Sequence, residues 1–371
     1  MTTTMRPEIQ NVHEYECILH FQLSGVDVSI ANSIRRTILS TIPTVVFRTE
    51  TFETNQCKIE INTGMLHNEI IKQRLGCIPV HSKDLTQLPG KYIMEMDVQN
   101  DTESILIITT EMFRIKHKAT GEYMSKEETA AIFPKNDRTN MFIDFARLRP
   151  KISDTIPGEH IKLSCEFGVG SADINGMYNV VSKCAYANTL DPAGAKDAWE
   201  RVQAKLAADG MPDDEIAFQK RNFYLLDAHR YFVPNSYDFV VETVGVYTNL
   251  EIVKKACAIM QNKFVDLVLS IESEDLPILN SGTTMPNSYD VVLQNEDYTV
   301  GKAFECMLYF LFFKGDETLS FCGFKKMHPH DSDSILRIAY KKDTDKMRIR
   351  ENLKIACRAA EEIYTQLFSK F

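Results

Sequence analysis

The chain has 371 residues, which is long enough for two or three domains, and its 44% hydrophobic and 25% charged residues are ordinary for a globular protein with real cores. A formal net charge of −9 excludes a general cationic surface for nucleic acid, so any DNA contact would have to be local. No stretch approaches roughly 18 continuous apolar residues, and the N-terminus lacks an apolar signal core, so neither a membrane span nor a secretory leader is expected.

The nine cysteines stand singly along the chain. Because no CxxC pair occurs, a zinc ribbon or a similar metal site is not expected. Several cysteines lie in apolar runs, where a free thiol behaves as a small hydrophobic side chain. We therefore expect a reducing compartment and no bound metal or other cofactor.

A strand over Glu14–Leu23 is expected to lead into an amphipathic helix over Asp27–Pro43. Asp27 or Ser29 can accept the free N–H groups of the first helical turn, and Pro43 prevents the helix from continuing. The apolar face carries Ile30, Ile34 and Ile38, and the opposite edge carries Asn32, Arg35 and Arg36. The arginines are either a solvated polar edge or a surface that recognises a protein partner, because guanidinium groups suit interface carboxylates and carbonyls.

The next part of the chain predicts strands around one short helix. Thr44–Asn62 is rich in β-branched and aromatic residues and should form one or two strands. His67–Val80 begins as a helix, Gly76 ends it, and Pro79 fixes an extended exit. Residues 91–167 read as a β-rich insertion, with strands over Tyr92–Val98, Ser104–Lys116 and Ile161–Gly168.

The following residues return to a mixed pattern. A strand over Tyr178–Ala187 precedes a charged helical segment, Asp191–Leu226, which is broken near Gly210. A strand over Tyr237–Val246 feeds a long helix over Asn249–Ile271. Residues 271–286 form the best linker, because they are acidic, contain glycine and two prolines, and show no period. Beyond it we expect strands over 288–294, 318–325 and 334–341 and helices over 298–313 and 346–368.

The segment Asp297–Tyr309 repeats the first helix 270 positions downstream. The cap and apolar phase match, with Asp297, Val300, Phe304 and Leu308 in place of Asp27, Ile30, Ile34 and Ile38, but Arg35 and Arg36 become Glu305 and Cys306. Each copy is followed by a long helix with apolar spacing near 3.5, which suits lengthwise packing on other helices. We therefore expect internal pairing through Ile30, Ile34, Ile38, Val300, Phe304, Leu308, Val253, Met260, Phe264, Leu353, Ile363 and Leu367. The alternative is that amphipathic helices resemble each other by chance.

Two motifs could carry chemistry. Met327–Asp333 (MHPHDSD) holds four possible metal ligands, His328, His330, Asp331 and Asp333, but one short loop cannot readily surround an ion, so a polar turn is favoured. Phe167–Asn175 (FGVGSADIN) has two glycines after a strand but lacks the third glycine of a dinucleotide fingerprint, so a surface turn is favoured.

Several segments resemble the α-type subunits of DNA-directed RNA polymerases, the family of bacterial α, archaeal D and L, and the eukaryotic third- and eleventh-largest subunits. Residues 31–44 (ANSIRRTILSTIPT) resemble the first helix of that family, and residues 68–80 (NEIIKQRLGCIPV) its RLG-x-IP segment. Residues 239–256 are similar to the closing strand and helix of a D-like subunit. Residues 295–308 and 321–333 are similar to an L-like subunit.

The resemblance implies an α+β protein in which a D-like and an L-like dimerisation half are fused and paired within one chain, as implied for nucleocytoplasmic large DNA viruses. The D-like half would be 1–52 with 168–270, the β-rich insert 53–167, the linker 271–286 and the L-like half 287–371. The four-cysteine zinc loop and iron–sulfur ligands of some D-like members have no counterpart, and segment 188–236 is unlike the cellular family.

The implied function is a non-catalytic platform that binds the β-like second-largest subunit, and then the largest subunit and small zinc-binding subunits, without specific DNA contact. The implied partner interface is Asn32, Arg35, Arg36, Arg74, Gly76, Ile78 and Pro79. The implied location is a virion and cytoplasmic viral factory, or otherwise the nucleus. Two alternatives remain: a stand-alone metal-dependent hydrolase using His328–Asp333, and a DNA-binding factor, which the net charge disfavours.

Overall fold

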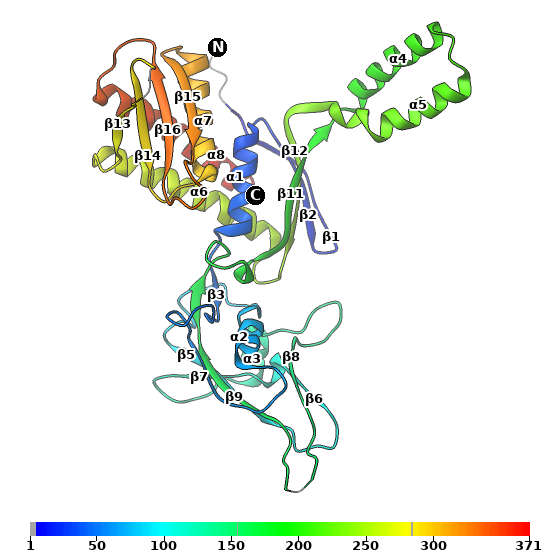
Figure 1. The fold of residues 1–371 in the computed structure, drawn as a ribbon, viewed down its shortest axis with the longest axis vertical. Helices are drawn as coiled ribbons and strands as arrows, with labels where there is room; N and C mark the ends of the chain where they lie inside the picture. Colours follow the sequence, from blue (N-terminus) through cyan, green and yellow to red (C-terminus); the bar gives the residue numbers. More distant parts are fainter. Residues whose placement is uncertain (1–4, 154, 283–284) are drawn as a thin grey trace. The chain divides into compact units, whose positions relative to one another are not determined.

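The computed structural model describes residues 5–153, 155–282 and 285–371. The chain forms two compact units (Figure 1). The first comprises the described part of Met1–Thr37 with Lys183–Val241 and Val253–Phe371, and the second comprises Ile38–Ser182 with Glu242–Ile252. The predicted insert, 53–167, lies within the second unit, which extends beyond it on both sides.

The first unit contains two four-stranded sheets, and the earlier one in the chain has the order β1-β2-β12-β11. Its elements are β1 (Glu8–Tyr15), β2 (Ile18–Ser24), α1 (Val28–Ser40), β11 (Val181–Leu190), β12 (Phe232–Thr243) and α6 (Asn249–Glu272). The single strand predicted over Glu14–Leu23 is wrong, because the chain turns at Glu16 and Cys17 and forms the hairpin β1–β2. Both turn residues have positive φ, 50° and 64°, although neither is a residue type that normally signals such a turn.

The second sheet has the order β13-β14-β16-β15. Its elements are β13 (Ile278–Asn280), β14 (Ser288–Leu293), α7 (Tyr298–Leu308), the π-helix η4 (Tyr309–Gly315), β15 (Leu319–Lys325), β16 (Ser334–Tyr340) and α8 (Lys346–Lys370). The predicted linker therefore contains a strand, β13, which pairs with β14. Both sheets arise from two strands, a helix, two strands and a long helix, and both join the strands in the same spatial order.

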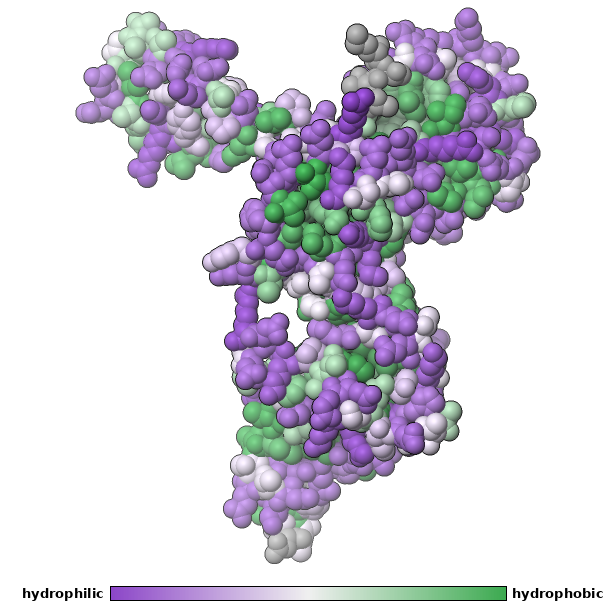
Figure 2. Space-filling view, turned by 180° about the vertical axis from the view of Figure 1, so that it is seen from behind, coloured by the Kyte–Doolittle hydropathy of each residue, from purple (hydrophilic) through white to green (hydrophobic). Residues whose placement is uncertain are grey.

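A helical hairpin stands between β11 and β12, as the broken helical pattern over Asp191–Leu226 predicted (Figure 1). It consists of α4 (Pro192–Ala208), α5 (Asp213–Leu225) and the 3₁₀ turn η3 (Asp227–Arg230). Trp199 and Phe223 form its small core, with ring centroids 5.5 Å apart. Other apolar side chains of the hairpin remain at the surface, where Figure 2 shows green residues among polar ones; Phe218 is 60% exposed.

The second unit is built on a sheet of order β4-β9-β5-β7, with two smaller strand pairs. The main sheet contains β4 (Cys57–Asn62), β5 (Tyr92–Gln99), β7 (Arg114–His117) and β9 (His160–Glu166). The pairs are β3 (Thr44–Val46) with β10 (Gly168–Gly170) and β6 (Leu106–Thr109) with β8 (Asp144–Leu148), and the remaining elements are α2 (Asn68–Gly76), α3 (Lys126–Ile132), η1 (Thr110–Met112) and η2 (Gly176–Tyr178). The helix α3 and the strand β8 were not predicted, although Ser125 and Glu128 form a complete capping box at the start of α3.

No helix among the described residues is long and apolar enough to cross a membrane.

Candidate protein-interaction site

The repeated helices begin with the same cap. The Asp27 carboxylate accepts a hydrogen bond from the Ser29 N–H at 2.9 Å, and the Asp297 carboxylate accepts one from the Thr299 N–H at 2.7 Å. Asp27, rather than Ser29, is therefore the capping residue of α1. The matched caps fix the register in which α1 and α7 can be compared.

The two caps take part in reciprocal contacts between α1 and α7. Arg36 donates to the Thr299 hydroxyl at 2.9 Å and forms an ion pair with the Asp297 carboxylate. At the position equivalent to Arg36, Cys306 of α7 lies beside Asp27 and Ser29, and burial raises the pKa of its thiol to about 12. Contacts in which each partner offers the equivalent part of its surface are the mark of a two-fold interface, so α1 and α7 pack in a pseudo-two-fold manner.

The electrostatics of this contact follow from its partial burial. Burial alone would raise the pKa of Asp297, but the hydrogen bonds from Thr299 and the charge of Arg36 hold it below its usual value. A second ion pair, between Lys263 of α6 and Glu296 at 2.7 Å, lies immediately before the α7 cap. Burial is the main influence on Glu296 and raises its pKa.

The long helices meet through aromatic residues at equivalent positions. Phe264 of α6 and Tyr364 of α8 lie 100 positions apart, as do Cys257 and Cys357. The rings of Phe264 and Tyr364 stack with their centroids 5.8 Å apart. A residue that touches its own counterpart lies on the symmetry axis. Phe304 packs edge-on against Phe264, and the Tyr364 hydroxyl shares a 2.6 Å hydrogen bond with Ser33.

The residues predicted for internal pairing are all buried. They are Ile30, Ile34, Ile38, Val300, Phe304, Leu308, Val253, Met260, Phe264, Leu353, Ile363 and Leu367, none more than 5% exposed.

The predicted partner residues of α1 divide into two groups. Arg36 makes the contact with α7, so its side chain serves the pairing of the two halves, a role that the sequence prediction did not give it. Arg35 is half-buried and donates twice to the Asn32 side-chain oxygen, at 3.0 and 2.9 Å. Its charge reaches Cys184 and Tyr186 of β11, where it opposes the rise in pKa that burial causes. Asn32 and Arg35 thus form a preorganised polar pair beside β11.

The other predicted partner residues lie at the end of α2, in the second unit. Arg74 donates to the carbonyl oxygens of Phe145 and Asp144 at 2.6 and 2.7 Å and so ties α2 to β8. Gly76 is buried; a Cβ there would lie 2.8 Å from the Met177 sulfur and 2.9 Å from the Thr49 hydroxyl. The backbone of the cap residue Cys77 is in the right-handed helical region, with φ of −81°. Gly76 is therefore required by close packing and not by a left-handed turn.

Two hollows flank this end of α2. One, of about 690 Å³, is lined by residues that include Glu50, Phe52, Lys72 and Met177. The other, of about 280 Å³, is lined by Arg74, Ile78, Ile143, Asp144 and Phe145, and both hollows share Gln73 and Cys77. Phe52 is 95% exposed at the edge of the larger hollow. Ile78 is buried and Pro79 half-buried. Exposed apolar side chains beside small hollows are the features of a protein-binding surface.

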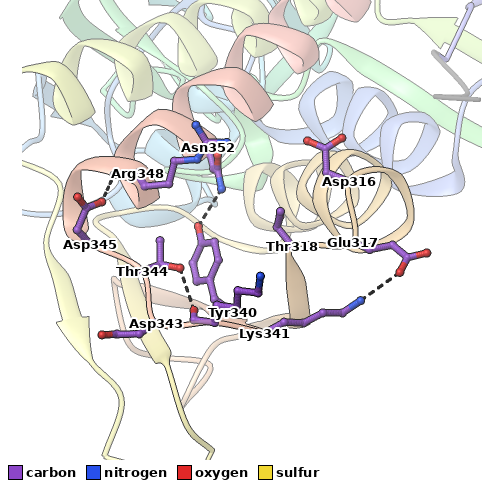
Figure 3. Close-up of a pocket in the computed structure, with 11 residues that line it drawn as sticks. Asp316, Glu317, Thr318, Tyr340, Lys341, Asp343, Thr344, Asp345, Arg348 and Asn352 are labelled. Atoms are coloured by element: carbon purple, nitrogen blue, oxygen red, sulfur yellow. Dashed lines mark hydrogen bonds and ion pairs between the residues drawn. The ribbon is translucent and has the colours of Figure 1, made fainter.

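A further cavity, of about 630 Å³, lies where β15 begins and β16 runs into α8 (Figure 3). Its lining carries charges of both signs, and Lys341 pairs with Glu317 at 3.2 Å. Asn352 donates to the Tyr340 hydroxyl at 3.2 Å, and Asp345 caps the first turn of α8. These bonds fasten the β16–α8 loop to the helix.

The motifs considered for chemistry form ordinary structure. The His328 and His330 rings stack, and the Asp331 carboxylate accepts the His328 N–H at 2.9 Å, which makes this segment a hydrogen-bonded polar turn. Within the described ranges, no three His, Cys, Asp or Glu side chains are grouped to hold a metal ion. Gly168 and Gly170 belong to β10 and pair with β3 instead of cradling a phosphate.

Comparisons with known proteins relate the chain to subunits of DNA-directed RNA polymerases. The RNA polymerase Rpb3/Rpb11 dimerisation domain matches residues 20–264. Subunit RPAC1 of human DNA-directed RNA polymerases I and III is 31% identical over 109 residues, 29% of this chain and 27% of the relative. Subunit Rpo3 of the Pyrococcus furiosus polymerase is 38% identical over 73 residues, 20% of this chain and 25% of the relative. A Tetrahymena thermophila conjugation stage-specific protein is 24% identical over 195 residues, 50% of this chain and 59% of the relative.

The chain thus spans between about a quarter and three-fifths of the length of these relatives. The family match covers most of the chain, including α1, the end of α2 and most of α6. The chain belongs to the RNA polymerase Rpb3/Rpb11 dimerisation-domain family.

Proposed function

We propose that this chain is the α-type assembly platform of a multisubunit DNA-directed RNA polymerase and carries both halves of that platform in one polypeptide. The observation that carries the proposal is the reciprocal packing of α1 on α7, in which Arg36 meets the Asp297 cap and Cys306 lies at the Asp27 cap. The shared strand order of the two sheets supports the assignment of residues 287–371 as an L-like half.

Fusion of the halves has a direct physical consequence. A segment of a few residues joins α6 to β13, so the second half is always present at high effective concentration beside the first. Assembly of the platform would not depend on a diffusional encounter. Nucleotide chemistry and its metal ions would lie on the large subunits that the platform gathers.

The partner we propose is the β-like second-largest subunit, followed by the largest subunit and small zinc-binding subunits. Asn32 with Arg35 in the first unit, and the end of α2 with Phe52 in the second, are the surfaces proposed to receive it. Arg36 is omitted from these surfaces because it bonds to α7. The nine free thiols are consistent with the reducing interior of a cell, either a viral factory or a nucleus.

Affinity purification of the tagged chain from cells that make it tests this function. The expected companions are the two largest subunits of an RNA polymerase in stoichiometric amount. A solitary protein with a metal-dependent hydrolytic activity would refute the proposal.

We expect Arg35→Ala to weaken capture of the β-like subunit by roughly 30-fold, because truncation of an interface arginine costs about 2 kcal/mol. The affinity of purified variants for that subunit is the measurement. Glu305→Ala is the matched control, since Glu305 is the equivalent residue of α7. Equal loss in both variants, or unchanged affinity in Arg35→Ala, would place the partner elsewhere.

A further inference from the structure

Two cysteines of the second unit face each other across adjacent strands. Cys57 is the first residue of β4 and is the register partner of Cys165 in the antiparallel strand β9. Both side chains are buried, at 4% and 0% exposure. They come from opposite ends of the second unit's sequence.

The hydrogen bonds around Cys57 define the type of pairing. The Glu166 N–H donates to the Gln56 carbonyl at 3.2 Å, one register step away. The N–H and the carbonyl of Cys57 both bond to the Asn55 side chain and so point away from β9. Cys57 and Cys165 therefore occupy a non-hydrogen-bonded site, where Cα atoms lie about 4.5 Å apart and side chains are closest. That separation falls within the range of about 4.4–6.8 Å found across disulfides.

The two buried thiols influence each other's ionisation. The Cys165 thiol donates to the Glu166 carbonyl at 3.5 Å. Its proximity is the main cause that lowers the pKa of Cys57, and the nearby charge of Lys72 acts in the same direction. The neighbouring Cys57 thiol and burial raise the pKa of Cys165. Cys57 stands at the end of the edge strand and is the thiol that an oxidant reaches first, and Cys165 is placed to resolve an oxidised Cys57.

We propose that Cys57 and Cys165 form a reversible cross-strand disulfide when the protein meets a peroxide. The Cys57 thiolate attacks one peroxide oxygen, so that an S–O bond forms, the O–O bond breaks and water leaves after protonation. The Cys165 sulfur then attacks the Cys57 sulfur, so that the S–S bond forms and the S–O bond breaks with loss of a second water. Overall, two thiols are oxidised and one hydrogen peroxide is reduced to two waters.

The position of the cysteine pair lets an oxidant reach Cys57 and lets the disulfide stabilise the fold. β4 is the edge strand of its sheet, and Cys57 stands at its first residue, so local opening of the strand end admits a small oxidant. The bond would join strands that are distant in sequence and fasten the edge strand to β9. β4 also contacts α2, and the charge of Lys72 on α2 acts on Cys57, so the disulfide would stabilise the base of the α2 surface.

The test treats the folded full-length chain with hydrogen peroxide, blocks free thiols by alkylation, and maps non-reduced peptides by mass spectrometry. The expected result is a disulfide-linked pair of peptides that contain Cys57 and Cys165, with a mass lower by two hydrogens than the sum of the two reduced peptides. Dithiothreitol should separate the pair and restore both free thiols. Thermal unfolding of the oxidised chain should shift to higher temperature and return after reduction.

Cys77→Ser is the matched control, because Cys77 is an exposed thiol at the end of α2 and its loss should leave the link intact. Cys257 and Cys357 are buried, and burial raises the pKa of each thiol. Both should therefore stay reduced during peroxide treatment and react with the alkylating reagent only after the protein is denatured. Cys165→Ser should abolish the link. The proposal is overturned if Cys57 and Cys165 of the wild-type chain stay free while other thiols oxidise, or if the link forms only in denatured protein.

Discussion

Phe264→Ala is expected to lower the free energy of unfolding by about 3–5 kcal/mol, because the side chain is fully buried and its loss leaves a cavity. The ring stacks on Tyr364 and meets the edge of Phe304, so one truncation removes aromatic contacts to both helices of the second half. Urea denaturation followed by circular dichroism is the measurement.

Phe368→Ala is the control for that substitution. Phe368 lies on α8 and is 43% exposed, so its truncation should cost far less than that of Phe264. Comparable losses from the two variants would show that Phe264 does not hold the halves together.

Gly301→Ala should destabilise the chain by about 1–3 kcal/mol through overpacking. An added Cβ would lie 1.9 Å from the Phe324 ring, which is nearly buried and packs against Tyr298 with ring centroids 5.1 Å apart. Alanine gains about 1 kcal/mol over glycine in a helix, so the clash must exceed this gain for the sign to be unfavourable. Thermal unfolding of the variant measures the net effect.

The matched change is Gly282→Ala, because a Cβ at that position meets nothing within 4 Å. The first half has Ala31, a buried residue, at the position equivalent to Gly301. A rise in stability on Gly301→Ala would contradict the close approach of α7 to β15.

The helices that carry the pairing could be predicted because their signals are local. The spacing of Ile30, Ile34 and Ile38 and the cap at Asp27 specify α1 within a few turns, and the same pattern recurs in α7. The strand β1 was missed because its residues are mostly exposed and polar, and its pairing with β2 depends on a tight turn at Glu16 and Cys17. Such pairing is a tertiary property that a short window does not reveal.

The candidate site was only partly predictable for the same reason. Arg74 and Gly76 could be singled out from the family resemblance, but their bonds to β8 and their packing against Met177 require the folded unit. The sequence places Arg36 on the polar edge of α1, and only the packing of α1 against α7 brings it to the Asp297 cap. The repeat nevertheless contains a signal for the contact between Arg36 and the Asp297 cap, since Arg36 and Cys306 each follow the capping aspartate of their own helix by nine residues.

The most direct measurement of the central claim is the behaviour of the chain after a single cut between the halves. A protease site placed between Glu274 and Asp275, which are exposed between α6 and β13, allows the folded protein to be cleaved. Size-exclusion chromatography should then show both fragments eluting together in equal amount, and the Phe264→Ala variant should release them. Two fragments that separate in native buffer, each still folded, would contradict an intramolecular pairing of two dimerisation halves.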